Sequence, residues 1–315
     1  LQMASVPTVT LPNGDKMPMV GLGTWQSTDE DGRKAVEHAI VEAGYRLIDT
    51  AALYANEKEI GDVLAKLFKE GKLKREEIFI TTKVWSTFIN PNRAEKSVRA
   101  SLERLQLDYV DLLLVHQPAA FDESFRIPEN IPVEDIWKGF EAIHAKGLAR
   151  SIGVSNFSAA QIERVVKIAK VPISNNQIEV YLYWPQHELV SVCHKHGISV
   201  TSYGSLASPG RVNVQHPPEF KAEWTPVPSP MENEKVVELA KKYGKTPGQI
   251  LLRYLIERGI CIIPKSANPQ RQKENINLFD FQLTKDEVAV LDKQPHRQRI
   301  FQQEFMIGHP EDGFE

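Results

Sequence analysis

The chain has 315 residues, of which 42% are hydrophobic and 25% charged, and its 38 basic and 41 acidic residues give a formal net charge of −3. This composition excludes a wholly disordered chain, and the lack of a basic excess argues against a nucleic-acid-binding protein. Two distant cysteines, Cys193 and Cys261, suit neither a disulfide scaffold nor a zinc site, and no apolar run approaches the roughly 20 residues that span a bilayer. We therefore expect a metal-free cytoplasmic protein that is not inserted in a membrane.

Short apolar runs alternate with amphipathic stretches along most of the chain. The runs have little polar alternation, as is typical of parallel strands covered on both faces. We predict strands over 21–24, 47–49, 78–83, 110–116, 151–155, 175–179, 199–203 and 261–265. Helical periodicity predicts helices over 32–41, 56–68, 91–105, 133–145, 158–168, 187–195, 234–243 and 247–257. Asn90 is the predicted cap of the third helix, with a proline at its first position.

Eight such alternations fit either a closed (β/α)₈ barrel or a large open, doubly wound sheet. The open sheet usually has a glycine-rich turn after its first strand that binds dinucleotide phosphates, and here Gly21 and Gly23 lack the third glycine. An Asn-Gly turn within 6–20 predicts a hairpin at the bottom of a barrel. We therefore predict an α/β protein with a single (β/α)₈ TIM-barrel domain over 1–315.

Three long segments interrupt the alternation: 117–131, 207–230 and 294–315. The first two follow strands four and seven, at the end of a barrel where active sites form. Loops of this length in compact domains are usually functional or disordered. We expect the third segment, a C-terminal tail, to lie over the same end.

Four polar residues lie at or just after the ends of neighbouring strands: Asp49, Tyr54, Lys83 and His116. Taken singly, such residues are commonly caps or surface pairs. Together they suit one chemistry. A tyrosine hydroxyl is a poor acid unless a cation such as Lys83 favours its phenolate, and Asp49 would pair with that buried ammonium. His116 could orient a substrate oxygen toward Tyr54. The set predicts protonation of an oxygen that gains negative charge, as in carbonyl reduction.

Three motifs in this order resemble the signatures of the aldo-keto reductase family. They are Gly44–Ala51 with Tyr54–Glu57 and Gly61; Lys146 with Ile152–Phe157; and Ile263–Ser266 with Arg271, Glu274 and Asn275. The family's catalytic Asp, Tyr, Lys and His then fall on Asp49, Tyr54, Lys83 and His116. The resemblance runs from Gly21 to about Leu291. It implies a barrel that carries NADPH across its carboxyl face, direct hydride transfer to a small carbonyl compound, and a monomeric cytosolic enzyme without metal.

The residues expected to bind the cofactor lie at the later strand ends. Ser155, Asn156 and Gln177 could hold the nicotinamide carboxamide, and Tyr203 offers a ring face for stacking, although a half-buried aromatic at the barrel rim is an equally good interpretation. Two cations and a hydroxyl at Lys265, Ser266 and Arg271 suit a 2′-phosphate, which favours NADPH over NADH. By resemblance, cofactor contacts also fall on Thr24, Trp25, Asp49, Leu206, Ser208, Glu274 and Asn275.

The substrate is less constrained by the sequence. Predicted pocket walls are Trp25, Trp85, Phe121 and Trp224, with His116 at the reacting oxygen. Gly204 and Ala267 depart from the residues common in the family and put two cofactor contacts in doubt. A non-enzymatic accessory or structural protein on the same fold is the alternative, and a lost Tyr or Lys would favour it. A steroid double-bond reductase would have Glu in place of His116.

Overall fold

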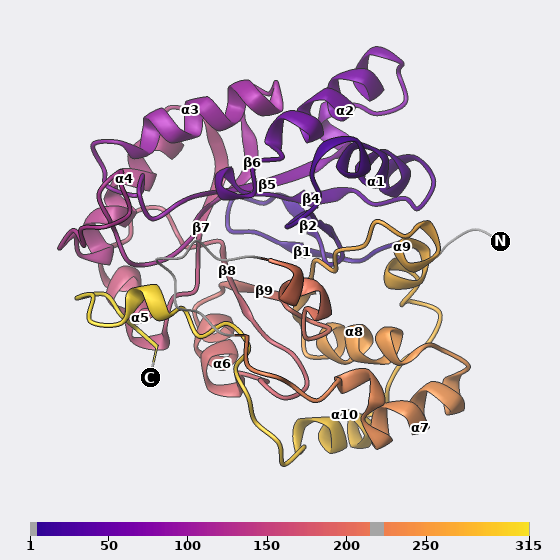
Figure 1. Cartoon of the computed structure of the whole chain (residues 1–315). Coiled ribbons are helices and arrows are strands. Elements are labelled where there is room, and N and C mark those ends of the chain that lie inside the picture. The colour runs from indigo at the N-terminus through magenta and orange to yellow at the C-terminus, as the bar shows by residue number, and fades with distance from the viewer. Residues whose placement is uncertain (1–4, 215–223, 315) are drawn as a thin grey trace.

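The computed structural model describes residues 5–214 and 224–314 (Figure 1). In it, eight parallel strands lie side by side in the order in which they occur along the chain. They are β3 Leu22–Gly23, β4 Leu47–Asp49, β5 Phe79–Val84, β6 Val110–Val115, β7 Ala149–Ser155, β8 Asn175–Glu179, β9 Ser199–Tyr203 and β10 Cys261–Ile262. Around them lie α1 Asp29–Val41, α2 Glu57–Lys69, α3 Ala94–Leu105, α4 Val133–Ala145, α5 Ala159–Ile168, α6 His187–Lys195, α7 Glu234–Tyr243, α8 Pro247–Glu257, α9 Pro269–Ile276 and α10 Lys285–Asp292.

Backbone hydrogen bonds between the first and last strands close the barrel. Val20 forms a parallel bridge with Ile262, whose N–H donates to Met19 and whose carbonyl accepts from Gly21. A Cβ atom at Gly23 would lie 2.4 Å from the carbonyl oxygen of Ile263, so this seam requires glycine. The predicted (β/α)₈ barrel is therefore confirmed, and the missing third glycine correctly argued against the open sheet.

Several predicted boundaries were wrong for identifiable reasons. Strand β10 ends at Ile262 instead of 265, and Pro264 within the predicted strand has no N–H to donate. Helix α3 begins at Ala94, because Asn90 accepts the Asn92 N–H in a turn and does not cap the helix. Helix α10 was missed, although Thr284 and Glu287 form a capping box at its start.

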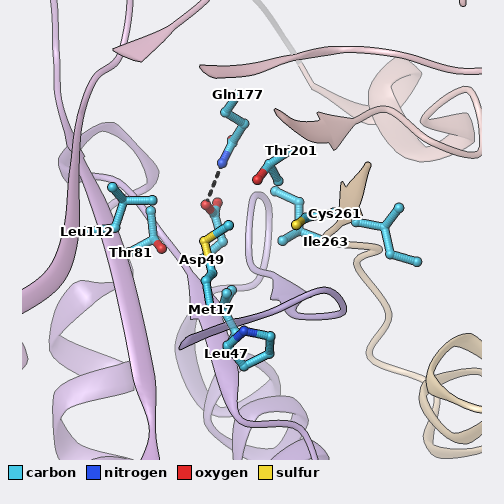
Figure 2. A pocket seen from close by; sticks show the side chains of 11 residues that line it. Met17, Leu47, Asp49, Thr81, Leu112, Gln177, Thr201, Cys261 and Ile263 are labelled. Atoms are coloured by element: carbon cyan, nitrogen blue, oxygen red, sulfur yellow. Dashed lines mark hydrogen bonds between the residues drawn. The ribbon is translucent and has the colours of Figure 1, made fainter. Parts of the chain in front are cut away.

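The N-terminal hairpin packs against the inside of the barrel. Its strands, β1 Thr8–Thr10 and β2 Lys16–Pro18, pair antiparallel with Thr10 opposite Lys16. Met17 lines a small cavity inside the barrel together with Leu47 and Leu112, and the same cavity reaches Asp49 and Gln177 (Figure 2). The hairpin thus fills one end of the barrel while polar residues occupy the interior nearer the other.

The long segments contain short 3₁₀ helices that the sequence did not predict. They are η3 Pro209–Asn213 and η4 Pro230–Glu232 in the segment after β9, and η5 Glu304–Met306 in the tail. The part of that segment over 215–223 lies outside the described residues. Arg93 fixes the segment after β6, since its guanidinium donates to the Thr87 and Phe121 carbonyls and pairs with Glu129. Within the described ranges, no helix is long and apolar enough to cross a bilayer.

Candidate active site

A buried lysine joins two of the predicted catalytic residues. Lys83 lies on β5 and is only 1% exposed, which is costly for an ammonium without partners. Its Nζ donates to Asp49 Oδ1 at 2.6 Å and to the Thr50 carbonyl at 3.0 Å, and lies 3.2 Å from the hydroxyl of Tyr54. The other oxygen of Asp49 accepts from Gln177 Nε2 at 2.8 Å (Figure 2). The strand ends therefore bring Asp49, Lys83 and Tyr54 into one hydrogen-bonded group.

Burial and charge act in opposite directions on this group. Burial raises the pKa of Tyr54, Lys83 opposes that shift and Asp49 adds to it, so that the pKa lies above its ordinary value. Lys83 thus acts in the expected direction but does not make Tyr54 a stronger acid overall. Burial lowers the pKa of Lys83, but the Asp49 carboxylate and Tyr54 outweigh it and the net shift is upward. At neutral pH the group holds a protonated Tyr54 beside a charged Lys83.

His116 follows the end of β6 and faces the same tyrosine. Its ring centroid lies 5.8 Å from that of Tyr54 and 5.0 Å from that of Trp85, edge-on in both cases. Burial, with a further contribution from the Lys83 charge, lowers the pKa of His116 well below its ordinary value. The imidazole is therefore neutral at physiological pH and can donate only one hydrogen bond.

The predicted nicotinamide-binding residues form a second network beside the first. Asn156 has a φ of 61°, a left-handed conformation that asparagine tolerates better than most residues. Its Nδ2 donates to the His116 carbonyl at 3.0 Å, and its Oδ1 accepts from the Tyr203 hydroxyl. Ser155 Oγ donates to the Gln177 carbonyl at 2.8 Å. The ends of β7, β8 and β9 thus bring all four residues together.

Two predicted cations lie on the loop and first turn between β10 and α9. Asn268 caps α9 by accepting the Arg271 N–H at 3.0 Å, and Ser266 Oγ accepts the Asn268 N–H at 3.1 Å. The side chains of Lys265 and Arg271 are exposed and make no hydrogen bond or ion pair within residues 5–214 and 224–314. Available cations at a helix start fit an anionic phosphate group.

The remaining predicted cofactor residues lie on α9, next to Asp49 and in the segment after β9. Glu274 accepts from Gln270 at 3.1 Å and does not pair with either cation, while Asn275 is buried. Thr24 is buried, and its hydroxyl donates to the Asp49 carbonyl at 2.8 Å. Leu206 and Ser208 are half-buried after β9.

Aromatic side chains form two groups near the carboxyl ends of the barrel strands. Trp85 contacts Phe125 and Phe305, at centroid distances of 5.5 and 5.8 Å. Trp25 and Trp224 instead pack against Phe301 of the tail, at 5.9 and 5.7 Å.

Of the four predicted walls, Phe121 is the most deeply buried, at 5% exposure, and packs with Ala119 and Met306. Sequence reasoning assigned no role to Phe125, Phe301 or Phe305. Phe301 and Phe305 of the tail lie in a segment without periodicity, so their apolar character was the only sequence signal for a role in the site.

The chain is similar to known aldo-keto reductases over nearly all of its length. The sequence model described as "Aldo/keto reductase family" matches residues 19–294. Aldo-keto reductase family 1 member A1 of Mus musculus is 40% identical over 90% of this chain and 88% of that protein. The NAD(P)H-dependent D-xylose reductase I,II of Candida tropicalis is 36% identical over 90% and 91%. A crystal structure of a Bombyx mori aldo-keto reductase in complex with NADP superposes with a TM-score of 0.87, at 39% identity, over 98% of this chain and 99% of that one.

Proposed function

Because the chain belongs to the aldo/keto reductase family and is an NADPH-dependent oxidoreductase of carbonyl compounds, we propose that Tyr54 is its proton donor. Bound NADPH supplies the hydride. The Tyr54 hydroxyl stays protonated at neutral pH and can give its proton to a carbonyl oxygen that becomes negatively charged. The single observation that supports this role most strongly is the 3.2 Å contact between Lys83 Nζ and the Tyr54 oxygen.

Lys83 and His116 stabilise different charges in this proposal. The Lys83 ammonium stabilises the phenolate that Tyr54 leaves behind, and Asp49 holds Lys83 in place through its 2.6 Å bond. The neutral His116 offers one N–H to the carbonyl oxygen without competing for its proton. The hydrogen bonds of Lys83 with Asp49 and Tyr54 are already formed without substrate, which favours a site organised before substrate binds.

We also propose that Lys265, Ser266 and Arg271 bind the 2′-phosphate of NADPH. This proposal is supported by the exposure of both cations near the start of α9, where neither has a side-chain partner in the described ranges. When the cofactor is bound, Tyr203 would stack on the nicotinamide ring, and Ser155, Asn156 and Gln177 would hold its carboxamide. NADH lacks the 2′-phosphate, so this arrangement favours NADPH.

We further propose that residues 1–315 form one domain that acts as a cytosolic monomer. This proposal is supported by the fact that the four proposed catalytic residues all come from one chain. Cys193 and Cys261 are free and buried, which suits a reducing compartment.

The test is NADPH oxidation by the purified chain with sugars, aliphatic aldehydes, aromatic aldehydes, quinones and steroids. We expect turnover with at least one aldehyde class and formation of the matching alcohol. The same assay with Tyr54→Phe controls for contaminating reductases, because they would leave the rate unchanged. NADPH binding without oxidation by any carbonyl would overturn the proposal and favour a non-enzymatic nicotinamide-binding protein.

A further inference from the structure

A buried carboxylate at the end of β8 binds the C-terminal tail. Glu179 is the last residue of β8 and is 1% exposed. Its Oε2 accepts the N–H of Ile300 and its Oε1 accepts the N–H of Phe301, each at 2.8 Å. One side chain thus satisfies two consecutive backbone donors that lie more than 120 residues away in the sequence.

Burying such a carboxylate costs folding free energy. Burial raises the pKa of Glu179 to about 7, although the two N–H bonds and the positive charges of Arg299 and Arg211 oppose the shift. Within the described ranges Glu179 has no ion-pair partner, so the tail N–H groups are its direct compensation. A barrel strand that needed only packing at this point would be more stable with an apolar residue.

The segment that Glu179 binds lies against the proposed cofactor and substrate residues. The Phe301 ring contacts Tyr203 at 5.5 Å, in addition to its contacts with Trp25 and Trp224. Two residues further along, Gln303 Nε2 donates to the Tyr203 hydroxyl at 3.4 Å. A shift of the tail at 300–301 therefore moves groups that surround the Tyr203 ring.

The far end of the tail has a separate attachment. Glu311 is buried and accepts from Arg164 at 2.7 and 2.9 Å and from Gln161 at 3.1 Å, on the outer helix α5. Between these two carboxylates the tail makes further contacts, for example from Gln303 to Gln117 at 3.1 Å and from His309 to the Ala120 carbonyl at 2.8 Å. Of the two carboxylates, Glu179 is the one that binds the backbone at Phe301.

We propose that Glu179 is a positioning residue for carbonyl reduction, which fixes Phe301 between Trp25 and Trp224 and so shapes the wall that receives the apolar part of the substrate. The proposal rests on the proposed function of the site. We expect Glu179 itself to touch neither substrate nor cofactor. Its effect passes through the backbone at Ile300 and Phe301.

The test compares Glu179→Gln with wild type at saturating NADPH, using an aromatic aldehyde and a short aliphatic one. Glutamine has nearly the same volume but can accept only one of the two N–H bonds. We expect KM for the aromatic aldehyde to rise about tenfold, as one lost charge-assisted bond would produce. The KM for the short aldehyde should rise less, while kcat changes by less than about threefold. Glu311→Gln is the matched control and should leave both KM values unchanged.

A double-mutant cycle separates this role from general support of the strand. Phe301→Ala alone should raise KM for the aromatic aldehyde by a similar factor. Adding Glu179→Gln to Phe301→Ala should then change KM by less than twofold. Independent effects that multiply, or an equal fall in kcat for both aldehydes, would overturn the proposal.

Two further results separate a failure of the positioning role from a failure to fold or a failure of the proposed function. If Glu179→Gln does not fold, Glu179→Asp keeps the charge but is too short for both bonds, and the same rise in KM is expected. Wild-type turnover with an unchanged KM in these variants would reject the positioning role alone. Absence of turnover in the wild type would instead reject the proposed function.

Discussion

Among the individual residues, Lys83 determines the charge balance of the proposed site. Its Nζ contacts both the Asp49 carboxylate and the Tyr54 hydroxyl. Its ammonium opposes the upward shift of the Tyr54 pKa that burial causes. Losing Lys83 would therefore leave Tyr54 a weaker acid and Asp49 a buried charge without its cation.

We predict that Lys83→Met lowers kcat for carbonyl reduction by about 10²-fold or more, and that Asp49→Asn lowers it less, because Asp49 acts by holding Lys83. Steady-state kinetics across a range of pH at saturating NADPH provide the measurement. An unchanged rate and pH profile for Lys83→Met would mean that Tyr54 has another activator. Circular dichroism of both variants checks that the barrel remains folded.

The sequence was sufficient to predict that Asp49, Tyr54, Lys83 and His116 lie together. Each stands at or just after a strand end, and parallel strand ends meet at one end of a barrel whatever the helices between them do. Glu179 also ends a predicted strand, but its partners at Ile300 and Phe301 lie in a tail with no periodicity. No local pattern reports such a long-range contact, so its role emerged only from the structure.

At the scale of elements, the seam between β3 and β10 controls closure. We predict that Gly23→Ala destabilises the fold by about 2–3 kcal/mol or more, because its Cβ would lie 2.4 Å from a backbone oxygen. Gly248→Ala in α8 is the control. The nearest atom there is 3.8 Å from the new Cβ, and alanine is the better helix former. Chemical denaturation measures both, and equal stabilities would contradict a tight seam.

The cations near the start of α9 should determine the preference for NADPH over NADH. Arg271→Ala should weaken NADPH binding about tenfold or more, since a charge-assisted hydrogen bond contributes roughly 1.5–3 kcal/mol. NADH should bind with nearly unchanged affinity. Fluorescence titration of both cofactors with wild type and variant gives the dissociation constants. Equal losses for the two, or a wild type that prefers NADH, would show that Arg271 does not recognise the phosphate.

Most elements were predictable because a parallel strand is a compact apolar run and a surface helix has a clear period. The failures occurred where another interaction decides the boundary. Pro264 lies where β10 was expected to continue, and the turn at Asn90 delays α3 to Ala94. The segment after β9 and the tail have no hydrophobic period, so their short 3₁₀ helices could not be predicted in this way.

At the scale of the whole molecule, the buried Glu179 couples stability to pH. Its folded pKa of about 7 exceeds the ordinary value of 4.5, so the folded protein binds this proton more tightly than the unfolded chain. The contribution is full below about pH 4.5 and is lost as pH rises through about 7. The difference in unfolding free energy between wild type and Glu179→Gln should therefore shift by up to about 3 kcal/mol against wild type between pH 5 and 8.

Urea unfolding of the two proteins at each pH measures this difference and cancels the contributions of the histidines, which both proteins share. A difference that stays constant with pH would mean that Glu179 does not titrate in this range. The same pair of proteins serves the kinetic test of the tail, so stability and positioning can be separated in one set of samples.

Carbonyl reduction by this chain depends, in the proposed mechanism, on Tyr54 as the proton donor, and Tyr54→Phe tests that role most directly. The change removes one oxygen and keeps the ring against His116. The measurement is kcat for aldehyde reduction together with the dissociation constant for NADPH. We predict that kcat falls by about 10²–10⁴-fold while NADPH binds as tightly as in wild type. A variant that turns over at the wild-type rate would contradict the assignment of Tyr54 and, with it, the proposed mechanism.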